Sequence, residues 1–139
     1  MTASLLYHLA AVLLVLYAAG HTMGFRYIDP RWGLDVFING LRATRFTVQG
    51  AERNFWGFYV GFGFFCTVLL LFSAVAAWQL GGLPLTTLER MPLLTWGFAL
   101  TFFSATIITG RYFFAAPTVF SMLVTICLAG AAWLSRGTV

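Results

Sequence analysis

The residues best suited to chemistry are a carboxylate, an imidazole and two guanidinium groups at the ends of long apolar segments. Glu52 and Arg53 precede one such segment, and His21 lies within a turn of the end of another. Arg111 closes a third. A carboxylate and an imidazole can work as a general acid–base pair, and guanidinium groups hold phosphate or carboxylate head groups. We therefore take Glu52 and His21 as candidate catalytic residues, and Arg53 and Arg111 as candidate ligand-binding residues.

Other candidates follow from the faces of the same segments. At about 100° per residue, the second segment places a mixed polar and aromatic strip opposite a phenylalanine face. The strip is Glu52, Trp56, Tyr59, Gly63, Cys66 and Thr67, and the opposite face is Phe55, Phe58, Phe62, Phe65 and Leu69. A polar strip in a membrane helix nearly always faces protein or a water-filled cavity, whereas the phenylalanine face is suited to contact lipid. The further ligand-binding candidates are Asn54, Trp56, Tyr59, Tyr17, Thr101 and Ser104.

A structural interpretation stays open beside the chemical one. Charged side chains gather at helix ends, and a carboxylate such as Glu52 near a helix N-terminus also favours the helix dipole. Serine and threonine in membrane helices often bond to carbonyls of their own helix. His8 and His21 lie on one segment about 20 Å apart by helical rise, so they cannot ligate one haem within a monomer. No metal-binding cluster is present in the sequence, and we expect neither a metal nor a cofactor.

Composition requires that a bilayer surround the chain. The 139 residues are 60% hydrophobic and 9% charged, far from the roughly 25% charged residues of soluble proteins. We expect one domain, residues 1–139, because the chain is short. A membrane-spanning helix needs about 20 mostly apolar residues, and four segments qualify: about 3–24, 54–80, 92–111 and 115–135. The first lacks the basic start of a signal peptide and is expected to be a retained membrane helix.

The first loop is unusually long for a chain with such short later connections. Asp29-Pro30 resembles a helix cap followed by proline at the first helical position. After it, Leu34, Phe37, Ile38 and Leu41 recur with helical spacing. This pattern predicts a short amphipathic helix, about 31–45, that lies in the membrane interface. The fold class is therefore all-α: an integral membrane four-helix bundle with an interfacial helix in its first loop.

Glycine pairs predict where the first two spans pack together. Gly20 and Gly24, and likewise Gly57 and Gly61, are spaced four residues apart at the first-loop ends of these spans. Small residues at this spacing let membrane helices approach closely. A possible second consequence is packing against another copy of the chain or another membrane protein.

The distribution of arginine predicts the orientation. Loops one and three carry six arginines, whereas the termini and loop two carry Arg90 and Arg136. The positive-inside rule then puts loops one and three in the cytoplasm and both termini on the outer side of the cytoplasmic (inner) membrane. The net charge of +4 is too scattered to indicate nucleic-acid binding.

Two motifs, GHTMGF and ERNFWGFYVGFG, resemble those of a family of small uncharacterised bacterial four-helix membrane proteins. The architecture also resembles the membrane-associated eicosanoid and glutathione metabolism proteins, which imply glutathione binding through an Arg-x-x-Asn-x-x-Glu motif. Here Arg53 and Asn54 are adjacent and Gly57 stands where the glutamate is expected, so that motif is not met. Emopamil-binding and sigma-2 receptor proteins are similar in helix number and imply a sterol-like ligand, but their pair of pocket acids has no counterpart.

These observations lead to one expected function and its alternatives. We expect a membrane protein that binds a lipid, sterol-like or isoprenoid small molecule at the loop-one end of the bundle, with possible acid–base chemistry on it. The alternative is a non-enzymatic accessory subunit or assembly factor that packs against a membrane partner. A glutathione-dependent membrane transferase or a small transporter is third.

Overall fold

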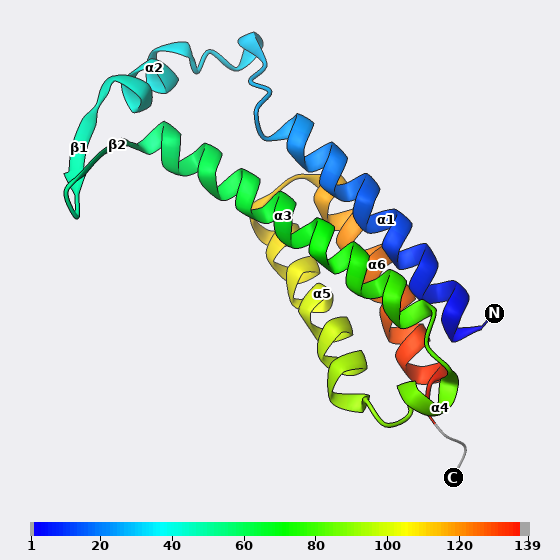
Figure 1. Cartoon of the computed structure of the whole chain (residues 1–139). Helices are drawn as coiled ribbons and strands as arrows, with labels where there is room; N and C mark the ends of the chain where they lie inside the picture. Colours follow the sequence, from blue (N-terminus) through cyan, green and yellow to red (C-terminus); the bar gives the residue numbers. More distant parts are fainter. Residues whose placement is uncertain (1, 137–139) are drawn as a thin grey trace. The chain divides into compact units, whose positions relative to one another are not determined.

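The fold is mostly helical, as the sequence predicts. A computed structural model describes residues 2–136 (Figure 1). In chain order, its elements are α1 (Ala3–Gly24), the 3-10 helix η1 (Pro30–Trp32), α2 (Asp35–Ala43), β1 (Arg45–Val48), β2 (Ala51–Asn54), α3 (Phe55–Gly81), α4 (Leu85–Leu88), α5 (Pro92–Tyr112) and α6 (Ala115–Leu134).

Four helices are long and apolar enough to cross a bilayer within the described residues 2–136. They are α1, α3, α5 and α6, and their ends lie within one residue of the predicted spans. The chain therefore has the helices of an integral membrane protein.

The chain divides into two compact units, which we describe separately. Unit 2 is Ala18–Leu69, and unit 1 is the remainder of the chain. The helices α1 and α3 contribute one part to each unit. The first loop and the helix ends that flank it thus form a unit of their own.

Unit 1 contains a core in which parts of all four long helices pack together. Tyr7 and Leu14 from α1 are fully buried there, as are Val124 and Leu128 from α6. Buried residues of α3, α4 and α5 complete the same cluster. The last two long helices, α5 and α6, run antiparallel and are linked by two hydroxyl pairs, Thr106–Thr125 at 3.2 Å and Thr109–Ser121 at 3.2 Å.

The glycines at which the chain packs most tightly are not the ones predicted from the sequence. Among the described residues, a Cβ at Gly20, Gly24 or Gly61 would meet no atom within 4 Å, and one at Gly57 would meet only the Asn54 side chain. The prediction that these pairs bring the first two spans together is therefore wrong. The tight positions are Gly63, Gly81 and Gly130, where a Cβ would lie 2.5 to 3.0 Å from a side chain of another segment.

Within unit 2, the first loop contains a shorter amphipathic helix than expected. The Asp29 carboxylate accepts the Arg31 backbone N–H at 2.9 Å and so caps η1, with Pro30 at its first position. Hydrogen bonds from the Arg31 side chain and backbone lower the pKa of the Asp29 carboxyl. Gly33 then takes a left-handed conformation, φ 65°, which ends η1 because glycine adopts it without strain. The amphipathic helix α2 follows, so the predicted 31–45 helix is in fact two short helices.

A β-hairpin replaces the expected helical start of the second span. Strands β1 and β2 pair antiparallel with Val48 opposite Ala51. The two-residue turn, Gln49-Gly50, has φ of 49° and 79°, and two positive φ values in succession define the turn that suits the twist of a hairpin. Glu52, Arg53 and Asn54 therefore lie on a strand, and the expectation that Glu52 continues the helical strip is wrong.

Candidate functional site

The hairpin separates the two charged residues that the sequence places side by side. Residues directly opposite each other in an antiparallel pair share a face, and successive pairs alternate faces. Glu52 lies on the face of Arg45, and its carboxylate pairs with that guanidinium at 3.5 Å. Arg53 lies opposite Phe46 on the other face. The first loop thus presents an ion pair on one face and an arginine beside an aromatic ring on the other.

Asn54 serves as a helix cap in this structure. Its side-chain oxygen accepts the backbone N–H of Gly57 at 2.7 Å, which satisfies one of the unpaired donors at the start of α3. This bond accounts for the polar side chain directly before a mostly apolar helix.

The cap gives a direct test of how α3 begins. Asn54→Ala is expected to destabilise the first turn of α3 by about 1 kcal/mol, so the Gly57 amide should exchange with solvent faster. Asn54→Ser keeps an accepting oxygen and should preserve protection. Amide hydrogen exchange in detergent measures both variants, and equal protection in Asn54→Ala and the parent would contradict the capping role.

His21 is held against the backbone of α3. Its Nε2 lies 3.0 Å from the Gly63 carbonyl oxygen, and because a carbonyl only accepts, Nε2 carries the proton and donates it. Gly63 lies eight residues beyond the start of α3, about 12 Å along the helix. Glu52 precedes that start, so the structure does not bring the carboxylate and the imidazole together.

Two further strip residues form an aromatic contact with the first loop. The Tyr59 hydroxyl donates to the Phe25 carbonyl at 3.0 Å, and the Arg42 guanidinium lies 4.6 Å from the centre of the Trp56 ring. The ring centres of Trp56 and Tyr59 are 5.4 Å apart. This face of α3 is therefore occupied by the chain itself.

The remaining ligand-binding candidates belong to unit 1. The Thr101 hydroxyl donates to the Gly97 carbonyl of its own helix at 2.9 Å, and Ser104 is exposed. Tyr17 stacks on Phe120 with ring centres 5.4 Å apart. Arg111, in the last turn of α5, lies 5.8 Å from the centre of the Tyr112 ring. The two hydroxyl pairs between α5 and α6, one buried and one part-buried, join other residues. The recurrence of threonine and serine on both helices is the sequence signal for them.

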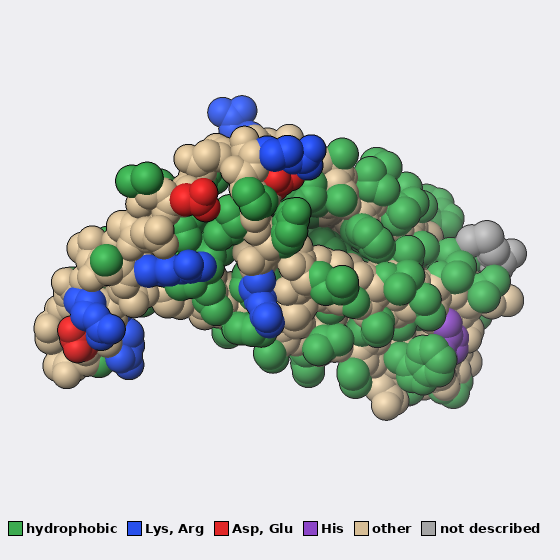
Figure 2. Space-filling model, turned by 90° about the horizontal axis from the view of Figure 1, so that it is seen from above, with side chains coloured by type: hydrophobic (Ala, Val, Ile, Leu, Met, Phe, Trp, Pro, Cys, Tyr) green, Lys and Arg blue, Asp and Glu red, His purple; other side chains and the backbone are tan. Residues whose placement is uncertain are grey.

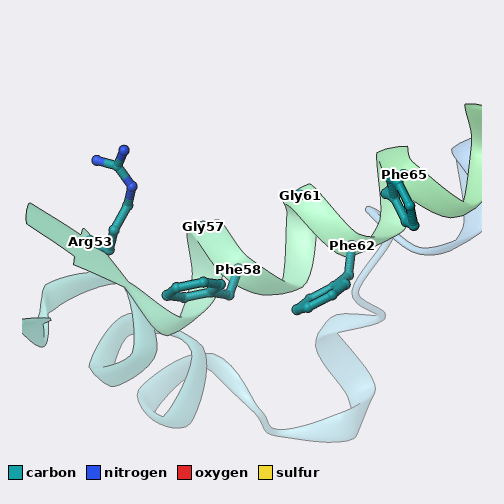
Figure 3. Close-up of a pocket in the computed structure, with 6 residues that line it drawn as sticks. All are labelled: Arg53, Gly57, Phe58, Gly61, Phe62 and Phe65. Atoms are coloured by element: carbon teal, nitrogen blue, oxygen red, sulfur yellow. The ribbon is translucent and has the colours of Figure 1, made fainter. Parts of the chain in front are cut away.

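The opposite face of α3 forms an open groove of about 360 Å³ (Figure 3). Its lining residues are Arg53, Gly57, Phe58, Gly61, Phe62 and Phe65. Figure 3 shows Arg53 at one end, the two glycines along the helix and Phe65 at the other end. Phe58 is 40% exposed and Phe62 is 66% exposed. The groove is apolar along the helix and cationic at its hairpin end.

The hairpin fixes the cationic end of this groove. The Phe46 ring stacks on Phe58 with centres 5.9 Å apart and planes 4° from parallel. Phe46 also contacts Phe55, with centres 4.9 Å apart. Because Arg53 shares the hairpin face of Phe46, these ring contacts hold it beside the groove. Figure 2 shows charged side chains gathered over the first loop, with mainly hydrophobic side chains over the long helices.

Sequence reasoning identified Arg53 but not the residues that form the groove. Gly57 and Gly61 were predicted as packing positions, and the phenylalanines as a lipid-facing surface. The sequence signal for the groove is a pair of glycines four residues apart on a helix face that also carries phenylalanine, next to a basic residue.

Within residues 2–136 no group of three His, Cys, Asp or Glu side chains is placed to hold a metal ion.

Comparison with known proteins returns no match among protein families, curated proteins or solved structures. The fold and the groove alone define the class of molecule: a small helical protein with four candidate membrane-spanning helices and an apolar groove that ends at an arginine.

Proposed function

We propose that the protein binds a lipophilic small molecule, a membrane lipid or a sterol-like or isoprenoid compound, in the groove of α3 at the loop-one end. The groove itself carries the proposal. Gly61 leaves open space along the helix, Gly57 adds no side chain to the groove that it lines, and the neighbouring phenylalanines offer apolar contact. A chain-like molecule gains dispersion contacts along such a surface.

The arginine distribution supports a membrane location with this groove on the cytoplasmic side. Six arginines lie in loop one or at the α5 end that leads into loop three, against two in the rest of the chain. Under the positive-inside rule, loop one and the start of α3 then lie at the cytoplasmic face of an inner membrane. The first loop would serve as a lateral gate beside the groove.

A glycine substitution tests the binding site directly. The full chain, purified in mild detergent, is incubated with a diazirine-bearing phospholipid, washed by detergent exchange and irradiated. Labelling should concentrate in residues 55–69. In Gly61→Leu, where the side chain fills the groove, labelling should fall at least about fivefold, equivalent to about 1 kcal/mol.

The matched control is Gly97→Leu on α5. Gly97 is also an exposed helical glycine with no atom within 4 Å of an added Cβ, but it does not line the groove. Labelling of residues 55–69 should be unchanged in this variant. Equal labelling in Gly61→Leu and the parent, or labelling spread evenly over all exposed helices, would overturn the proposal.

A second candidate function is packing against a partner helix. The observation that favours it is the same glycine pair, because the absence of side chains at Gly57 and Gly61 also lets another helix backbone approach. Light scattering with protein and detergent counted separately distinguishes the two. An oligomer or a stoichiometric protein partner that dissociates in Gly61→Leu, without any retained lipid, would favour the accessory-subunit function.

A further inference from the structure

We infer that the groove selects a lipid of one leaflet whose headgroup carries a net negative charge, and that Arg53 recognises this charge. The inference rests on the proposed function and adds the chemical class of the ligand. It depends on three features of unit 2: the placement of Arg53, the absence of a competing carboxylate, and the length of the groove.

Arg53 is placed by strand pairing rather than by a flexible helix end. Its position opposite Phe46 in the hairpin, together with the Phe46–Phe58 stack, puts its guanidinium at the hairpin end of the groove (Figure 3). A register shift of one residue would move Arg53 to the other face of the hairpin. The fold thus specifies which of the two hairpin arginines meets the groove.

The Arg53 guanidinium is left with donors to spare. One nitrogen, Nη1, donates to the Glu52 backbone carbonyl at 2.7 Å. The nearby Glu52 carboxylate is turned to the other hairpin face and pairs with Arg45, and within residues 18–69 no carboxylate lies within 4.0 Å of Arg53. A guanidinium has five N–H donors and binds phosphate through two parallel hydrogen bonds. Its remaining donors therefore suit an anionic headgroup.

The groove spans most of the depth of one leaflet. From Gly57 to Phe65 it extends eight residues along α3, about 12 Å by helical rise. The hydrocarbon core of a bilayer is about 30 Å thick, so one leaflet accounts for about half of that. A lipid with its headgroup at Arg53 would place its chain along the glycines and phenylalanines of the same leaflet. On the cytoplasmic side, that leaflet is the one with a negative surface potential.

Two phospholipids with identical chains test the headgroup preference. The full chain in mild detergent is titrated with dioleoylphosphatidylglycerol, which is anionic, and with dioleoylphosphatidylcholine, which is zwitterionic, and bound lipid is counted by native mass spectrometry. We expect about tenfold tighter binding of the anionic lipid. A third arm uses inorganic phosphate as competitor, which should displace little lipid at millimolar concentration because it lacks the chain.

The matched variants are Arg53→Gln and Arg45→Gln. These arginines lie on opposite faces of one hairpin, so both changes remove the same charge from the same segment. Arg53→Gln should reduce the preference to twofold or less, Arg53→Lys should retain part of it, and Arg45→Gln should retain all of it. Preserved preference in Arg53→Gln, or equal loss in both glutamine variants, would overturn the inference.

Failure of this inference can be told from failure of the proposed function. If both lipids bind equally well and Gly61→Leu blocks both, the groove binds lipid without reading its charge. If neither lipid binds the parent protein, the inference fails together with the membrane-lipid form of the proposed function. Displacement of lipid by inorganic phosphate at low concentration would show that Arg53 binds a free anion instead, which would also overturn the inference.

Discussion

Gly63→Leu is expected to destabilise the helix pair of unit 2 by about 1–3 kcal/mol, the usual effect of overpacking a filled contact. A Cβ at position 63 would lie 2.5 Å from two ring carbons of Phe25 and 2.8 Å from a third. The ring must therefore move, and the Gly63 carbonyl that accepts the His21 hydrogen bond lies beside it. Amide hydrogen exchange over residues 18–28 should report the loss of protection.

Gly61→Leu is the control for this effect, two residues earlier on the same helix. An added Cβ there meets no described atom within 4 Å, so the unit should keep its stability while the groove is blocked. Both variants replace a helical glycine by leucine, so the gain in helix propensity is the same in each. A difference in stability between them therefore reports packing. Equal protection of residues 18–28 in the two variants would contradict the packing of Phe25 on Gly63.

The long helices could be predicted because their signal is an average over many residues. Twenty apolar residues in succession have few alternatives to a spanning helix, and single residues change the average little. Helical periodicity also placed Trp56, Tyr59, Gly63 and Thr67 on one strip. The structure brings Tyr59 and Gly63 against Phe25, and Thr67 within 2.9 Å of Thr22. The strip thus contacts the end of α1 or the first loop.

The hairpin was missed although a local signal for it is present. Gln49-Gly50 is flanked by four residues on each side that form strands, and a two-residue loop ending in glycine is a hairpin signal. The polar residues beside an apolar helix favoured the simpler interpretation of a helix end. That choice gave Glu52 a helical phase that it does not have. The expected pairing of Glu52 with His21 rested on a different inference, that both residues lie at helix ends on the same side of the membrane.

The groove could not be predicted from the sequence because a helix face forms a groove only where no other segment packs against it. The pattern of phenylalanine predicted a lipid-facing surface, and that surface is exposed. Whether Gly57 and Gly61 face another helix or open space depends on the tertiary contacts of unit 2. In unit 2 the contact with Phe25, just after α1, is made at Gly63 instead. Gly57 and Gly61 therefore have no other described segment packed against them.

Gly50→Val should open the hairpin and abolish the headgroup preference while the groove still binds lipid chains. Gly50 has a φ of 79° and no atom within 4 Å of an added Cβ, so the effect is on the backbone and not on packing. A β-branched residue in this conformation is strained by roughly 1–3 kcal/mol, and a two-stranded hairpin is only marginally stable. Opening it would release Arg53 from its register with Phe46.

An asparagine at position 50 tests whether the effect of valine comes from backbone strain or simply from the loss of the glycine. Gly50→Asn should keep both the hairpin and the preference, because asparagine tolerates positive φ better than other side chains. Amide exchange over residues 45–54 measures the hairpin, and the anionic-to-zwitterionic binding ratio measures the preference. If Gly50→Val lost amide protection but kept the ratio, the hairpin would not be what places Arg53, and the charge selection would have to come from another group at the groove. Parallel loss of protection and preference in Gly50→Val, with both kept in Gly50→Asn, is the result that strand pairing predicts.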